Sequence, residues 1–144
     1  MTLLADLFFS FRSPYSALAI GRYRELAEDH TVDIALRPVY PLAIRQPDFF
    51  ERNHPNWLGY TLRDVMRVAQ FEGIAFGPPR PDPIVQDIAS RKIAADQPYI
   101  YRITRLGQAA ARRGRGLAFA ADAARLALGQ LGLGQRLDPG HPAE

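Results

Sequence analysis

The chain has 144 residues, of which 47% are hydrophobic and 23% charged, and its formal net charge is +3. This length and composition are typical of one globular domain and exclude a disordered chain, and the mild, scattered charge gives no reason to expect a nucleic-acid partner. The sequence has no cysteine, which excludes structural disulfides, thiolate metal sites and Cys-x-x-Cys redox chemistry. No apolar run approaches the ~20 residues that span a bilayer, and no basic signal region opens the chain, so we expect a soluble, cytoplasmic protein without a membrane partner.

The opening of the sequence predicts a strand, a helix and a second strand. A short apolar run of seven residues has the length of a buried strand. Ser13 followed by Pro14 is a typical helix start, because serine caps free N–H groups and proline fits the first helical position. Such a βαβ unit implies a parallel strand pair. The unit, residues 1–41, comprises a strand at 3–9, a helix at 14–28 and a strand at 32–39.

Beyond residue 41 the sequence predicts helices and no further strand. Asn56 is expected to cap one of them, the proline-rich segment 77–83 to be a stiff extended connection, and Gly107 to weaken its helix only modestly. Helices are expected at 47–52, 56–73, 84–96, 99–113 and 117–128, which makes residues 42–128 an all-helical insert before an irregular tail at 129–144.

Four segments resemble one family when they are taken in chain order. They are Asp6–Ser16 (Asp-Leu-Phe-Phe-Ser-Phe-Arg-Ser-Pro-Tyr-Ser), Arg37–Arg45, Gly77–Pro83 and Arg115–Ala120. The set resembles the 2-hydroxychromene-2-carboxylate isomerases and the related kappa-class glutathione transferases. The resemblance covers residues from about 3 to 125, and it implies an α/β, thioredoxin-like fold in which a helical insert separates a βαβ unit from a closing ββα unit.

The resemblance also implies that glutathione is a bound cofactor, held by Ser13, Pro14 and Tyr15, with the Ser13 hydroxyl donating to the glutathione sulfur. In such enzymes the thiolate adds to a conjugated double bond of an aromatic 2-oxoacid and leaves again after rotation. A helix N-terminus favours a thiolate on physical grounds alone, since its free N–H groups and dipole stabilise negative charge. The alternative for Ser13 is a plain N-cap with no ligand.

Three further residues are candidates for the aromatic substrate. Arg45 follows the second predicted strand, where it can meet a substrate carboxylate, Trp57 can stack on a bicyclic ring, and Tyr99 can line an aromatic pocket. A solvated loop arginine and ordinary core packing are the alternatives for these side chains. No metal site is expected, because the three histidines lack the spacing of metal ligands.

The expected closing ββα unit has no counterpart in the sequence, so we expect a single thioredoxin-like domain over residues 1–144, truncated at its C-terminus. An isolated pair of parallel strands has unpaired edges, which a second copy in a homodimer or further strands would cover. The function expected from the resemblance is a glutathione-dependent isomerase. The alternatives are a kappa-class-like glutathione transferase and a non-catalytic fragment of the family.

Overall fold

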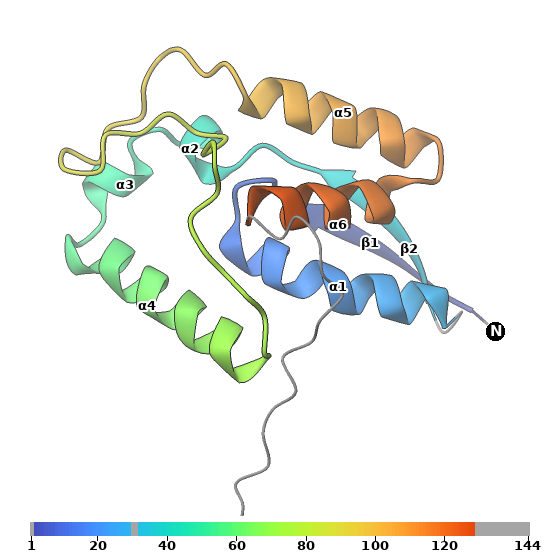
Figure 1. Ribbon diagram of the computed structural model, residues 1–144. Coiled ribbons are helices and arrows are strands. Elements are labelled where there is room, and N and C mark those ends of the chain that lie inside the picture. The colour runs from blue at the N-terminus through green and yellow to red at the C-terminus, as the bar shows by residue number, and fades with distance from the viewer. Residues whose placement is uncertain (1, 30–31, 129–144) are drawn as a thin grey trace, which may run out of the picture.

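The computed structural model describes residues 2–29 and 32–128, so the expected tail at 129–144 lies outside the described residues. The predicted strand–helix–strand opening is confirmed. The elements are β1 (Leu3–Phe9), α1 (Pro14–Glu28), β2 (Val32–Pro38), α2 (Leu42–Arg45), α3 (Phe49–Arg52), α4 (Asn56–Phe71), α5 (Ile100–Arg112) and α6 (Gly116–Ala127) (Figure 1).

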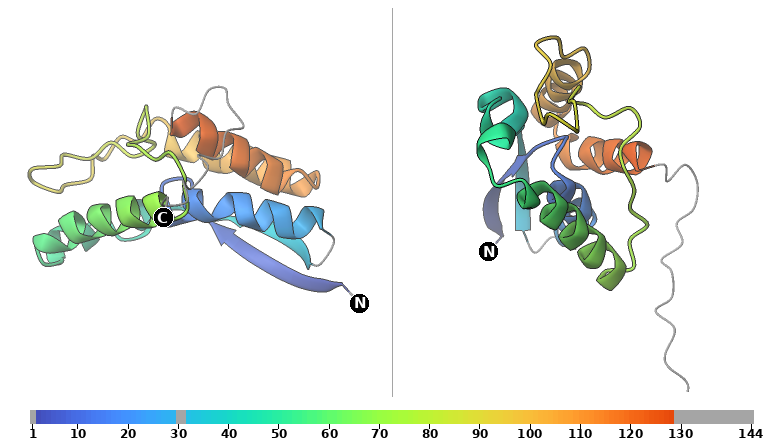
Figure 2. Two further views of the ribbon diagram at one scale, coloured as in Figure 1. Left: turned by 60° about the horizontal axis from the view of Figure 1, so that its bottom comes forward. Right: turned by 90° about the vertical axis from the view of Figure 1, so that its left-hand side faces the viewer.

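β1 and β2 form a parallel sheet whose register runs from Leu3 opposite Val32 to Phe9 opposite Pro38. Helices α1 and α6 lie side by side on one face of this sheet (Figures 1 and 2). Side chains alternate along a strand, so residues two apart point to the same face and bury together. The resulting sheet cluster consists of Phe9, Ile20, Leu36, Ala120, Ala121 and Ala124, each at most 9% exposed.

The other face of the sheet is open. Leu4 and Phe8 point to it and are 81% and 68% exposed, and between the strands Arg37 Nε donates to Asp6 Oδ1 at 2.9 Å. Within the described residues β1 pairs with β2 alone, so its second edge is also free. The predicted mixed α/β architecture with a two-stranded parallel sheet is therefore present.

Helix α5 approaches the strands closely because it carries Gly107. A Cβ built at this position would lie 2.5 Å from Cζ of the Phe11 ring and 3.4 Å from Cγ of Pro38, too close for the ring to stay where it is. The expectation that Gly107 only weakens a helix is therefore incomplete. The glycine lets Phe11 pack directly on the backbone of α5.

The expected helix at 84–96 is wrong. Residues 73–99, which we call the strap, connect α4 to α5 without a helix or strand, and an isolated antiparallel bridge joins Gln86 to Ile93 (Figure 1). The proline-rich residues 77–83 form no helix or strand, but bends at residues 80, 81 and 83 interrupt the extended connection that the sequence predicts. The rest of the strap is shaped by side chains, above all Gln97, which is 5% exposed.

The Gln97 amide explains why the strap does not become helical. Its Oε1 accepts from the Val85 N–H at 2.8 Å, while Nε2 donates to the Val85 carbonyl at 2.9 Å and to the Ala94 carbonyl at 2.8 Å. Arg91 adopts φ 63°, a left-handed conformation that ends any helix. These contacts satisfy backbone groups that a helix would otherwise pair. They also bury Ile84 at the centre of a second cluster with Ala43, Phe50 and Ile100.

The region between β2 and α4 differs from expectation in two details. The short helix α2 was not predicted, and it begins directly after Pro41, whose fixed φ suits a helix start. Asn56 is the first residue of α4 rather than its cap, because the Nδ1 atom of His54 accepts the Asn56 N–H at 3.2 Å. Val65 and Ala69 of α4 bury against Leu18 of α1. None of the helices in the described residues is long and apolar enough to cross a membrane.

Replacing Gly107 with alanine should destabilise the protein even though alanine is the better helix former. Displacing the Phe11 ring should cost about 1–3 kcal/mol, more than the ~1 kcal/mol gained in helix propensity. Gly59 in α4 has nothing within 4 Å of a built Cβ, so Gly59→Ala is the matched control and should stabilise the fold. Thermal denaturation of both variants measures the difference, and equal shifts of the two melting temperatures would contradict the packing role.

Candidate functional site

Ser13 lies at the N-terminus of α1, directly after the turn that leaves β1. Its backbone is extended (φ −73°, ψ 119°), its Oγ accepts a hydrogen bond from the Ser16 N–H at 3.3 Å, and Pro14 occupies the start of the helix. This confirms the N-cap that the Ser-Pro pair predicts. The bond uses one lone pair of Oγ, so the half-buried hydroxyl keeps its proton for donation to another acceptor.

Tyr15 uses its phenol to connect α1 to α4. The hydroxyl donates to Asp64 Oδ2 at 2.5 Å. This hydrogen bond, together with burial and the negative charge of Asp64, raises the pKa of Tyr15 to about 12. The backbone N–H of Tyr15, in the first turn of α1, has no acceptor inside the helix by helical geometry. A ligand at this helix end therefore meets the main chain of Tyr15 rather than its phenol.

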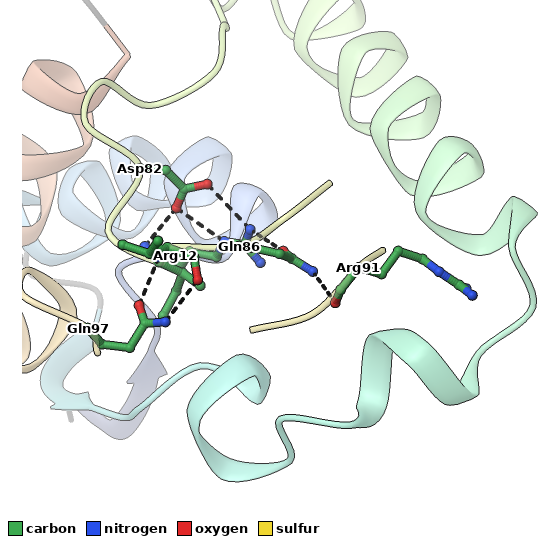
Figure 3. Close-up of polar contacts among 7 residues, drawn as sticks. Arg12, Asp82, Gln86, Arg91 and Gln97 are labelled. Atoms are coloured by element: carbon green, nitrogen blue, oxygen red, sulfur yellow. Dashed lines mark hydrogen bonds and ion pairs between the residues drawn. The ribbon is translucent and has the colours of Figure 1, made fainter. Parts of the chain in front are cut away.

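The guanidinium of Arg12, the residue before Ser13, holds the strap. Arg12 Nε and Nη2 donate to the two carboxylate oxygens of Asp82 at 3.4 and 3.3 Å, and Nη2 also donates to Gln86 Oε1 at 2.8 Å (Figure 3). Its Cζ lies 5.7 Å from the centre of the Phe50 ring, within cation–π range. The Arg12 side chain is 18% exposed and that of Asp82 is 39% exposed, so the arginine end of the pair is the more shielded from water.

Asp82 and Gln86 extend the contact along the strap. Asp82 Oδ1 also accepts from the Ile84 N–H at 2.8 Å, and Gln86 Nε2 donates to the Arg91 carbonyl at 3.0 Å (Figure 3). Arg91 Nη1 in turn donates to the carbonyl of Asn53, the residue that ends α3, at 3.0 Å. One series of hydrogen bonds thus runs from the start of α1 through the strap to the end of α3.

Trp57 belongs to a group of aromatic rings behind Arg12. Its ring centre lies 5.3 Å from that of Phe49 and 6.0 Å from that of Phe50, the ring beneath the Arg12 guanidinium. Trp57 is half-buried. These contacts are those of the packing alternative for Trp57, and the Phe50 ring lies next to both its indole and the Arg12 guanidinium.

Arg45 and Tyr99 lie in different surroundings. Arg45 is exposed at the end of α2, and its Nε donates to the Tyr40 carbonyl at 2.8 Å. The ring beside Tyr40 is that of Tyr101, at 5.4 Å between ring centres, whereas Tyr99 is 48% exposed before α5. In the described part of the chain none of the three candidate substrate residues shares a hydrogen bond or ring contact with Ser13.

Two concavities of the described surface lie away from Ser13. One of about 470 Å³ follows α5 and is lined by residues that include Tyr101, Arg102 and Arg105. A second, of about 780 Å³, lies between the end of α1 and the turn before α6. Among the described residues no group of three or more His, Asp or Glu side chains lies close enough to hold a metal ion.

Gln86 and Gln97 belong to no motif that marks them in the sequence, and Arg12, although it lies in the segment Asp6–Ser16, is 70 positions from Asp82. The sequence does carry one signal that points to a partner for Asp82. Asp82 is a carboxylate between Pro81 and Pro83, neither of which can donate an N–H group to it, and its charge calls for a cationic partner, either the neighbouring Arg80 or a more distant side chain.

Comparisons of the chain with protein-family models, with curated proteins and with solved structures found no match. The family resemblance of the four sequence segments therefore stays a hypothesis.

The raised pKa of Tyr15 gives a titration that can be measured. Its value of about 12 in the folded state exceeds the usual 10.0, so the bond to Asp64 stabilises the fold below about pH 10 and is lost as the pH rises from 10 towards 12. Asp64→Asn should bring this phenol back towards the ordinary value, which ultraviolet absorbance of tyrosinate can follow. Asp122→Asn, which removes an exposed partner of Arg125, should leave it unchanged. A late-titrating tyrosine that persists in Asp64→Asn would contradict the assignment.

Proposed function

We propose that this chain binds glutathione with its thiol against the N-terminus of α1, and that it acts as a glutathione-dependent isomerase of aromatic, 2-hydroxychromene-2-carboxylate-like compounds. The observation that carries the proposal is the state of Ser13, which caps a helix of 15 residues while its hydroxyl proton stays available. The four sequence segments that resemble the isomerase family support the same function.

The end of α1 suits an anionic sulfur. A helix of this length presents a partial positive charge at its N-terminus, and a thiol placed there ionises more readily. The first turn of α1 contains no acidic residue that would oppose a negative charge. Ser13 can add a charge-assisted hydrogen bond from its hydroxyl, and Tyr15 a second donor from its backbone N–H. The residues present therefore fit a thiolate ligand.

Glutathione, when bound, supplies the nucleophilic thiol that a chain without cysteine lacks. Ser13 holds the sulfur through its hydroxyl proton, and Pro14, which has no N–H, keeps the first turn in helical geometry. Arg45 remains the candidate for the substrate carboxylate, since its Nε is bonded to the Tyr40 carbonyl and its terminal nitrogens keep further donors.

Three substitutions at Ser13 separate capping from sulfur binding. Ser13→Ala removes the cap and the donor, and should lower stability by about 1 kcal/mol and abolish glutathione-induced stabilisation. Ser13→Asp preserves a capping oxygen but carries no donor proton and repels a thiolate, so it should stay stable and still fail to bind. Ser13→Thr retains both groups and should respond as the wild type does. Melting temperatures with and without glutathione give the readout.

The wild-type protein should gain about 2.7 kcal/mol at a glutathione concentration a hundredfold above Kd. S-methylglutathione, which has no ionisable thiol, is the control ligand and should bind more weakly. If millimolar glutathione leaves the melting temperature of the wild type unchanged, the proposed function is wrong. If Ser13→Asp responds like the wild type, glutathione binds but Ser13 does not donate to its sulfur.

A further inference from the structure

Three consecutive residues before α1 are attached to three different parts of the protein. The Phe11 ring packs against both the sheet cluster and the cluster around Ile84, and it touches the backbone of α5 at Gly107. The Arg12 side chain binds the strap, and Ser13 caps α1. Since Phe11 and Ser13 hold the backbone on either side, the position of Arg12 and that of the strap depend directly on each other.

The strap depends on side chains for its position because it has little backbone pairing of its own. Within the strap, strand-like pairing is limited to the bridge between Gln86 and Ile93. A main-chain hydrogen bond from the Arg80 N–H to the Ala127 carbonyl at 3.2 Å ties the strap to α6. Arg12 adds three hydrogen bonds to two strap residues four positions apart, Asp82 and Gln86. A planar guanidinium can satisfy both acceptors at once, which an ammonium group cannot do in the same geometry.

We propose that Arg12 is a positioning residue for glutathione: by binding Asp82 and Gln86 it holds the strap beside the start of α1 and keeps the Ser13 hydroxyl in the geometry that binds sulfur. The inference rests on the proposed function, because it assigns Arg12 a role in the same site. We assign Arg12 no contact with the ligand, because its Nε and Nη2 donate to the strap and its side chain is 18% exposed.

The direction in which Asp82→Asn changes the Kd of glutathione distinguishes this role from two alternatives. Asp82→Asn has the same shape and can still accept the Ile84 N–H, but it removes the negative partner of Arg12. If Arg12 positions the strap, losing this partner weakens glutathione binding. If Arg12 instead binds a glutathione carboxylate directly, freeing it from Asp82 strengthens binding. If the contact serves stability alone, the melting temperature falls while Kd stays the same.

The experiment measures the Kd of glutathione by calorimetry at a temperature where every variant is folded. Arg12→Gln and Asp82→Asn should each raise Kd roughly tenfold, and the double variant should raise it by less than the product of the single effects, because both changes break the same contact. Arg12→Lys should recover only part of the affinity. Arg37→Gln is the matched control, since it breaks an exposed arginine–aspartate pair on the open face of the sheet and should leave Kd unchanged.

Amide hydrogen exchange supplies a readout that needs no ligand. In Arg12→Gln, two N–H groups of the strap should exchange faster: that of Ile84, which donates to Asp82, and that of Val85, which donates to Gln97. The Ser16 N–H, which donates to Ser13 Oγ, should also exchange faster. Faster exchange in the strap with an unchanged Kd overturns the positioning role and leaves the proposed function intact. Absence of glutathione binding by the wild type overturns the proposed function itself, and with it the assignment of Arg12.

Discussion

The contact of the Phe11 ring with the backbone of α5 at Gly107 is the constraint on which the rest of the structure depends. The ring also meets Phe9 at 5.1 Å and Phe119 at 5.8 Å, both edge to face, a favoured geometry for aromatic pairs. Through these contacts the end of β1 is joined to α5 and α6. Because this ring is part of both clusters, the sheet and the strap are packed on one continuous apolar interior.

The elements that follow from short-range patterns were predictable. The β1–α1–β2 unit and the capping role of Ser13 depend on residues close together in sequence, and the structure contains both. The strap was not predictable in this way, since the residues around Ile84 have ordinary helical preferences. Their conformation is decided by the Gln97 amide and by Arg12, at separations that a local pattern cannot contain.

The candidate site likewise combines short-range features that the sequence predicts with long-range contacts that it does not. The neighbours of Ser13 predicted its N-cap, and the resemblance of the four segments implied its role toward a thiol, whereas the partner that occupies the Tyr15 phenol, Asp64, lies 49 positions away. Trp57, proposed from its chemistry as a stacking surface, is half-buried against Phe49 and Phe50. The sequence thus predicts the helix start at which a sulfur ligand is proposed to bind, and the packed structure decides which surrounding side chains keep donor groups free.

The distance in sequence between Arg12 and Asp82 also bears on the order in which the chain folds. The cap of α1 closes over three positions, but the contact between Arg12 and the strap closes a loop of 70, and the entropy lost on closing a loop grows with its length. During synthesis Arg12 leaves the ribosome long before its acceptors do. On loop-closure entropy alone, the cap of α1 is expected to close before the contact between Arg12 and the strap, so this contact is a place to look for slow steps in refolding.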